Sequence, residues 1–302
     1  MTVTGVPFGS VVTAMVTPFT ADGALDLDGA ARLAAHLVEQ GNEGLVVNGT
    51  AGEASTTTDA EKADLVRVVA QTVGARVNVV AGVGTNDTAH SVALARQAAD
   101  AGATGLLVVT PYYNRPPQAG VIAHTRRVAD STGLPVMLYD IPARCGIALT
   151  TETIVELAAH PRVVAVKDAK LDLTATSWVL SRTDLAYYAG DDASLLPVLA
   201  IGGVGVIGTS THFVARETAE LIEAFVSGDV ARAQGLHRRL MPAFTGVFRT
   251  QGTILVKAGL REQGLPAGPV RLPLLDATQD ELAQLRADLA DAGVALTAGV
   301  AA

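Results

Sequence analysis

The sequence predicts an α/β fold, a (β/α)8 TIM barrel followed by a C-terminal helical extension. Short apolar runs rich in β-branched residues alternate eight times with segments of helical periodicity, as expected for parallel strands joined by helices. The alternative is a doubly wound open sheet. That fold usually has fewer strands and carries a Gly-rich phosphate loop after its first strand, where this chain has Thr17-Pro18-Phe19. We therefore favour the barrel.

The predicted strands are short and almost wholly apolar, which is typical of strands buried on both faces. They cover residues 11–16, 44–47, 77–81, 105–109, 135–138, 163–166, 185–189 and 203–207. The predicted helices between and after them cover residues 25–40, 58–73, 87–101, 119–131, 151–159, 173–182, 193–200 and 215–227.

Several helix ends carry their own signals. Start signals are Thr58 with Glu61 three residues later, Asp87, and Thr151. A glycine stands where five of the helices should end, and these are Gly41, Gly74, Gly102, Gly133 and Gly202.

The pattern changes to helices alone from about Asp229. These helices are predicted at residues 229–240, around 242–250, at 254–263 and at 278–292. We therefore predict a barrel with the active site over residues 1–228 and a helical extension over residues 229–302. The last eight residues carry little structural signal.

Composition narrows the class of protein. A hydrophobic content of 49% with 17% charged residues favours a large core, and a net charge of −8 without a basic block argues against nucleic acid as a partner. The N-terminal segment resembles no secretory signal, and no apolar run reaches membrane-spanning length. Cys145 is the only cysteine, which excludes an internal disulfide. We expect a cytoplasmic protein without a membrane partner.

Two reactive side chains end neighbouring predicted strands. Lys167, one of only four lysines, directly follows residues 163–166, and Tyr139 directly follows residues 135–138. Because parallel strands end at the same barrel face, both side chains should lie in one site. An apolar barrel top favours the unprotonated, nucleophilic amine, which predicts Lys167 as a Schiff-base nucleophile with Tyr139 moving protons. The alternatives are a structural lysine paired to Asp168 and an ordinary amphipathic tyrosine.

Other strand ends supply groups suited to binding carboxylates. The loop NGTAGEAS at 48–55 has glycines that let backbone N–H groups approach a small anion, and Thr50 adds a hydroxyl. Arg144 is suited to clamping a second carboxylate. The alternatives are an ordinary strand-to-helix turn and a solvated arginine. The strand ends hold no grouping of His with carboxylates, so we expect neither a metal nor a cofactor.

Five ordered motifs resemble those of a known family. They are GTAGE at 49–53, TPYYNRPP at 110–117, YDIPARCG at 139–146, VKDAK at 166–170 and GDD at 190–192. They resemble the pyruvate-dependent class I aldolase superfamily and are most similar to the dihydrodipicolinate synthase (4-hydroxy-tetrahydrodipicolinate synthase) family. The likeness extends from VTPF at 16–19 to the C-terminal helices.

The resemblance implies a Schiff-base lyase that needs no cofactor. It would condense pyruvate with L-aspartate 4-semialdehyde to 4-hydroxy-tetrahydrodipicolinate, a step in lysine and diaminopimelate biosynthesis. Lys167 would form an imine with pyruvate, and Tyr139 would hydrogen-bond at that imine. Thr50 would link Tyr139 to Tyr113, which would be lent across the tight interface of a homotetramer built as a dimer of dimers.

The resemblance also implies how substrates are held. Arg144 would bind the carboxylate of the aldehyde acceptor, and its context P-A-R-C-G favours the synthase over the sialic acid lyase branch. Gly190 and Ile207 would offer backbone carbonyls. Ala51 would give its N–H to the pyruvate carboxylate.

Ala51 departs from the family pattern, which has a hydroxyl residue at this position. Losing one hydrogen bond to a charged group costs on the order of 1.5–3 kcal/mol. Four readings follow: a weak synthase, a synthase using Thr17 or Thr209 as another donor, a related aldolase acting on a 2-oxo sugar acid, or a non-catalytic barrel that binds a 2-oxo acid.

A second departure concerns feedback by lysine. The positions that match the family's lysine site, beside Tyr112, include Asp59, Lys62, Asn86 and His90. Lys62 places a cation where a cationic effector would bind, and like charges repel. We therefore predict an enzyme that is insensitive to lysine.

Overall fold

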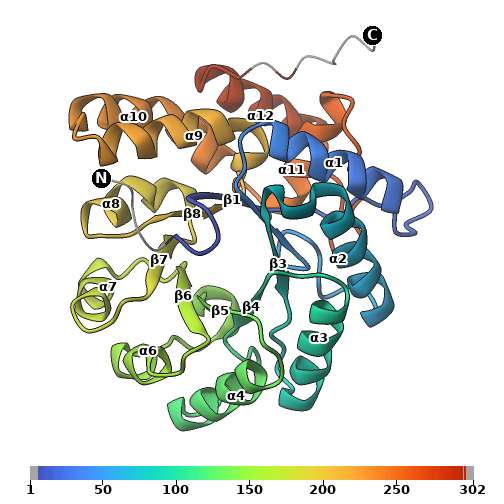
Figure 1. Cartoon of the computed structure of the whole chain (residues 1–302). Helices are drawn as coiled ribbons and strands as arrows, with labels where there is room; N and C mark the ends of the chain where they lie inside the picture. The colour runs from blue at the N-terminus through green and yellow to red at the C-terminus, as the bar shows by residue number, and fades with distance from the viewer. Residues whose placement is uncertain (1–5, 295, 297–302) are drawn as a thin grey trace.

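The computed structural model describes residues 6–294 and residue 296. Within these residues eight parallel strands close into a barrel in the order β1 to β8, with β1 paired to both β2 and β8 (Figure 1). The strands are β1 (Val11–Ala14), β2 (Gly44–Val47), β3 (Asn78–Gly82), β4 (Gly105–Val109), β5 (Val136–Asp140), β6 (Val163–Asp168), β7 (Ala186–Ala189) and β8 (Gly205–Gly208). The predicted barrel is confirmed.

Helices form an outer ring around the barrel (Figure 1). They are α1 (Leu27–Glu39), α2 (Asp59–Val73), α3 (Thr88–Asp100), α4 (Gln118–Asp130), α5 (Pro142–Cys145), α6 (Thr151–Ala158), α7 (Leu173–Leu180), α8 (Leu195–Ala200) and α9 (Thr211–Val226). The 3₁₀ turns η1 (Gly74–Arg76) and η2 (Asp192–Ser194) adjoin α2 and α8. After the barrel come α10 (Val230–Gly246), α11 (Gly252–Glu262) and α12 (Gln279–Asp291).

Some predicted boundaries were wrong. β5 and β6 extend through Asp140 and Asp168, so that Tyr139 and Lys167 lie inside the strands and share their ladder. Gly133 was predicted to end a helix, but α4 ends earlier, at a Ser131 cap. The start signal of α6 is the hydroxyl of Thr150, one residue before the predicted Thr151.

The C-terminal helices also differ from prediction. Residues 229–240 and 242–250 were predicted as two helices, yet α10 runs continuously through Pro242 to Gly246. A proline inside a helix costs about 3 kcal/mol. Burial of Leu240 and Phe244, which lie on either side of it, offsets that cost.

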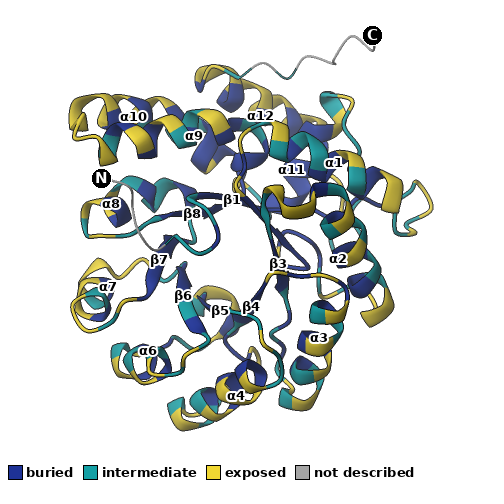
Figure 2. Cartoon of the chain, viewed as in Figure 1, coloured by how far each residue is buried: buried dark blue, intermediate teal, exposed yellow. Residues whose placement is uncertain are grey.

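Buried residues line the strands and the inner faces of the helices, while the outer faces are exposed (Figure 2). One apolar cluster includes residues of the barrel and of α10 to α12 alike. The predicted boundary at residues 228 and 229 falls in the turn between α9 and α10, and the division into two parts stays an interpretation. Of the helices described, none has the length and apolar character needed to cross a membrane.

Candidate active site

Lys167 and Tyr139 lie side by side at the carboxyl ends of β6 and β5. The strand register pairs them directly, and the Lys167 Nζ lies 4.3 Å from the centroid of the Tyr139 ring. Each residue is only 5% exposed. The two predicted side chains are therefore adjacent and almost completely buried at the barrel mouth.

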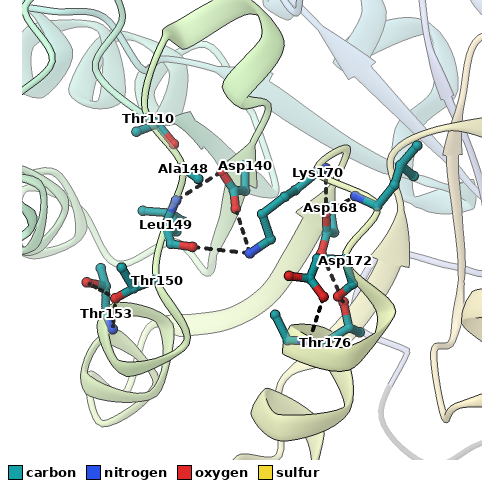
Figure 3. A network of polar contacts seen from close by, with 12 residues as sticks. Thr110, Asp140, Ala148, Leu149, Thr150, Thr153, Asp168, Lys170, Asp172 and Thr176 are labelled. Atoms are coloured by element: carbon teal, nitrogen blue, oxygen red, sulfur yellow. Dashed lines mark hydrogen bonds and ion pairs between the residues drawn. The ribbon is translucent and has the colours of Figure 1, made fainter.

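Asp168 is not the partner of the Lys167 amine. Its carboxylate accepts hydrogen bonds from the Thr176 hydroxyl at 3.1 Å and the Lys170 N–H at 2.6 Å (Figure 3). It also accepts a hydrogen bond from the Tyr187 hydroxyl at 2.6 Å. Successive residues of a strand point to opposite faces, so Asp168 faces the helices and Lys167 the barrel interior. The alternative of a structural Lys167–Asp168 pair is therefore wrong.

The loop after β2 has a strained backbone. Asn48 and Glu53 both have positive φ, at 55° and 53°, a conformation that costs a non-glycine residue free energy. At Gly82 the Asn48 carbonyl oxygen lies 2.2 Å from where a Cβ would stand, so only glycine lets the loop approach β3. Such strain persists only where surrounding contacts hold the loop.

Two hydroxyls hold this loop through its carbonyls. The Thr17 hydroxyl donates to the Gly52 carbonyl at 2.7 Å, and the Thr253 hydroxyl of α11 donates to the Ala51 carbonyl at 3.2 Å. The single hydroxyl proton of Thr17 is therefore engaged, which removes Thr17 as a substitute for the hydroxyl missing at Ala51. Thr50 is exposed, whereas Ala51 is buried.

Glu53 anchors the same loop by a buried ion pair that sequence reasoning missed. Its Oε1 lies 2.6 Å from the Lys257 Nζ of α11, and its Oε2 accepts the Arg271 N–H at 2.8 Å. Lys257 is wholly buried, and burial lowers its pKa to about 8 despite Glu53. The scarcity of lysine in the chain was the one signal that pointed to Lys257.

A cavity of about 630 Å³ opens at this end of the barrel. Of the eight predicted site residues, its wall contains Thr50, Tyr113, Tyr139 and Arg144. The other four lie outside the wall, namely Lys167, Ala51, Gly190 and Ile207. Lys167 is next to the wall through its contact with Tyr139.

Gly190 and Ile207 are fixed by the sheet. The Gly190 N–H donates to the Asp168 carbonyl at 2.7 Å, and a Cβ at Gly190 would approach that carbonyl oxygen to 2.8 Å. Ile207 is buried in β8 and pairs with Val12 of β1. Their predicted role in binding stays a prediction.

Tyr113 and Arg144 line the cavity from the segments that follow β4 and β5. Tyr113 has a positive φ of 71° and is 89% exposed. Arg144 lies in α5, a single turn that begins with Pro142 and ends at the left-handed Gly146. In the part of the chain described, no hydrogen bond joins Thr50 to Tyr139 or Tyr113, so the predicted relay stays a prediction.

The comparisons with known proteins agree with this geometry. A family model, the Dihydrodipicolinate synthetase family, matches residues 7–292. The chain belongs to this family. The predicted resemblance is thereby confirmed, and with it the class of lyase.

Relatives are similar over almost their whole length. A protein named 4-hydroxy-tetrahydrodipicolinate synthase from Acidothermus cellulolyticus is 65% identical over 95% of this chain and 93% of its own. 4-Hydroxy-tetrahydrodipicolinate synthase 2 of Streptomyces coelicolor is 59% identical over 96% and 97%. The crystal structure of the enzyme from Cyanidioschyzon merolae, solved with lysine bound, has a TM-score of 0.93 and 43% identity over 95% and 98%.

The cavity wall also contains most of the positions predicted to match the family's lysine site. They are Asp59, Lys62, His90 and Tyr112. Asp59 pairs with the His90 Nε2 at 2.9 Å, and the Lys62 ammonium donates to the Thr57 carbonyl. Burial lowers the pKa of Lys62. Asn86 lies outside the wall and accepts a hydrogen bond from Asn114.

Among the described residues no three His, Cys, Asp or Glu side chains gather as metal ligands would. The buried His212 accepts the Val16 N–H through Nε2, and its Nδ1 lies 2.8 Å from the Thr209 carbonyl. Burial lowers its pKa to about 4, which keeps the ring neutral. This histidine supports the backbone between β8 and β1.

Proposed function

We propose that this chain is a lyase that condenses pyruvate with L-aspartate 4-semialdehyde to give 4-hydroxy-tetrahydrodipicolinate. The observation that carries the proposal is the Lys167–Tyr139 pair, which is buried and adjacent at the barrel mouth of a chain 65% identical to a named synthase. A buried amine beside a phenol can form and hydrolyse imines.

The reaction begins at Lys167. Its amine attacks the ketone carbon of pyruvate, and water leaves as the imine forms. Loss of a proton from the pyruvate methyl group gives an enamine, whose carbon attacks the aldehyde, and the aldehyde oxygen takes up a proton. The amine of the second substrate then displaces Lys167 and closes the ring. Tyr139, in contact with the Lys167 amine, carries the protons between these steps.

Backbone and guanidinium groups hold the two substrates. The N–H groups of the loop at Thr50 and Ala51 bind the pyruvate carboxylate, and the carbonyls of Gly190 and Ile207 take part in binding, as the family resemblance implies. Arg144 binds the carboxylate of the aldehyde substrate. Two observations support this role for Arg144: it lines the cavity, and it pairs with no carboxylate among residues 6–294. The cytoplasmic location predicted from the sequence stays part of this proposal.

The chain acts as a homotetramer in which Tyr113 completes the partner's site within each tight dimer. Supporting this, Tyr113 is 89% exposed and has a positive φ, so an isolated subunit would hold a large aromatic residue in solvent on a strained backbone. Mixing Lys167→Ala with Tyr113→Phe protein tests it. If Tyr113 acts across the interface, the mixed dimer regains one intact site of its two. No recovered activity, with mixed dimers verified by mass spectrometry, would contradict this arrangement.

Borohydride trapping tests the chemistry itself. Wild-type protein reduced in the presence of pyruvate should gain the adduct mass on the Lys167 peptide, while Lys62, Lys170 and Lys257 serve as internal controls. Lys167→Ala should keep its fold and lose the adduct. Absence of an adduct in the wild type would refute Schiff-base chemistry and leave a binding barrel.

The acceptor is tested separately. A coupled assay compares aspartate semialdehyde with sugar aldehydes, and we expect turnover with the first. Turnover with sugar aldehydes alone would assign the chain to a related aldolase, the reading that Ala51 keeps open. Activity should persist in EDTA.

A further inference from the structure

A second charged layer lies directly behind the reacting pair. One residue beyond Tyr139 and Lys167, the strands pair Asp140 with Asp168. Asp140 is fully buried and faces the helices, as does Asp168. Nothing in the proposed reaction uses these carboxylates, and a buried carboxylate needs a cationic or hydrogen-bonding partner.

Lys170 is that partner for Asp140. Its Nζ lies 3.3 Å from the Asp140 Oδ2 and donates to the Leu149 carbonyl at 3.1 Å, while the Leu149 N–H donates to the Asp140 Oδ1 at 3.1 Å. Figure 3 shows the ammonium reaching across from the segment after β6 to both groups. The Asp140 carboxylate, the Leu149 backbone and the Lys170 ammonium thus form a closed ring of contacts, which joins β5, the loop after it and the segment after β6.

The loop enclosed by this ring carries Arg144. It leaves β5 at Asp140, forms α5, and returns to Asp140 at Leu149. Its far end is also held by the Gln118 side chain, which donates to the Ala148 carbonyl at 2.9 Å. The Lys170–Leu149 bond therefore supplies the tie between this loop and the strand of Lys167.

The backbone of Lys170 is fixed as firmly as its side chain. Its N–H donates to the Asp168 Oδ1 at 2.6 Å, and that carboxylate is itself held by Tyr187 and Thr176. The Lys170 side chain is 14% exposed, so solvent screens the ion pair only in part. Any movement of the Arg144 loop away from β6 would break this bond and expose Asp140 without a partner.

We propose that Lys170 is a positioning residue that fixes the Arg144 loop at a set distance from Lys167. This inference rests on the proposed function, because it assigns Arg144 to the aldehyde substrate. Lys167 forms its adduct with pyruvate before the aldehyde binds, so loss of Lys170 affects the second substrate and spares the first.

The test uses full-length Lys170→Met, Lys170→Arg and the double variant Asp140→Asn/Lys170→Met. Lys170→Met should raise KM for aspartate semialdehyde about tenfold, since small displacements of a positioning group reduce rates by one to two orders of magnitude. KM for pyruvate and the yield of the borohydride adduct should stay within about twofold of wild type, because the variant does not displace Lys167. Lys170→Arg keeps a donor at this position and should restore most of the aldehyde KM.

The double variant separates positioning from folding. It removes the unpaired buried carboxylate, so its Tm should return toward that of wild type, while its aldehyde KM should remain high because the tie is still missing. The inference is overturned by an unchanged aldehyde KM in Lys170→Met, or by a pyruvate KM that rises in parallel. It is also overturned by an aldehyde KM that recovers with Tm in the double variant. Failure of the wild type itself to turn over aspartate semialdehyde would instead refute the proposed function, and this inference with it.

Discussion

Replacing Lys257 with methionine should destabilise the protein and weaken pyruvate binding together. Methionine keeps the apolar stem and removes the ammonium, which lies 2.6 Å from Glu53 and also donates to the Pro269 carbonyl at 2.8 Å. Glu53 is then left buried with the Arg271 N–H as its remaining hydrogen-bond donor among the described residues. Because Glu53 belongs to the loop that we propose binds the pyruvate carboxylate, the site should loosen as well.

The expected loss follows from burial. Breaking a buried ion pair by removing one partner costs about 3–5 kcal/mol. Unfolding entropy of about 2.1 cal/mol/K per residue, taken over 302 residues, converts this to a fall in Tm of about 5–8 °C. The positive φ of Glu53 adds to the effect, since the strained backbone depends on this anchor.

Differential scanning calorimetry and pyruvate kinetics measure both consequences. Arg286→Met is the matched control, because it breaks an exposed pair with Glu262 of α11 and should lower stability by less than about 1 kcal/mol. The double variant Glu53→Gln/Lys257→Met removes both charges and should recover part of the Tm. A Lys257→Met protein no less stable than the control, with an unchanged KM for pyruvate, would refute the reasoning.

Three further expectations concern single sites. Ala51→Ser restores a hydroxyl to the loop and should lower KM for pyruvate about tenfold, the equivalent of one hydrogen bond to a charged group; a KM that stays the same or rises would contradict this. Burial raises the pKa of Asp140 from 3.8 to about 6, so the native state binds more protons than the unfolded state between these values and loses stability as pH rises through them. Between pH 4 and 7 the free energy of unfolding of Asp140→Asn should therefore rise relative to that of wild type, by up to about 3 kcal/mol. Curves of Tm against pH that run parallel for the two proteins would disprove this. Finally, millimolar lysine should leave the activity unchanged, because Lys62 places a cation in the cavity wall; strong inhibition would count against this interpretation.

The sequence by itself determined the barrel and the neighbouring positions of Lys167 and Tyr139, the proposed nucleophile and proton carrier. Eight apolar runs in strict alternation with helices favour a closed barrel over a doubly wound open sheet, and parallel strands bring their carboxyl ends to one mouth. Some helix starts were also predicted correctly from the sequence. Thr58 and Glu61 form the predicted capping box, and Asp87 caps α3. Each of these inferences depends on residues that are close in sequence or related by strand pairing.

Only the tertiary structure decided what holds the site together. Thr253 contacts Ala51 across 202 positions, and Arg271 reaches Glu53 across 218. No periodicity encodes such pairs, because they form where α11 and the segment between α11 and α12 meet the loop after β2. Lys170 is near Lys167 in sequence, yet its bond to Leu149 depends on how the loop after β5 folds back onto its own strand. The sequence identified the groups that we propose to react, whereas packing of distant segments determined how firmly the loops around them are held.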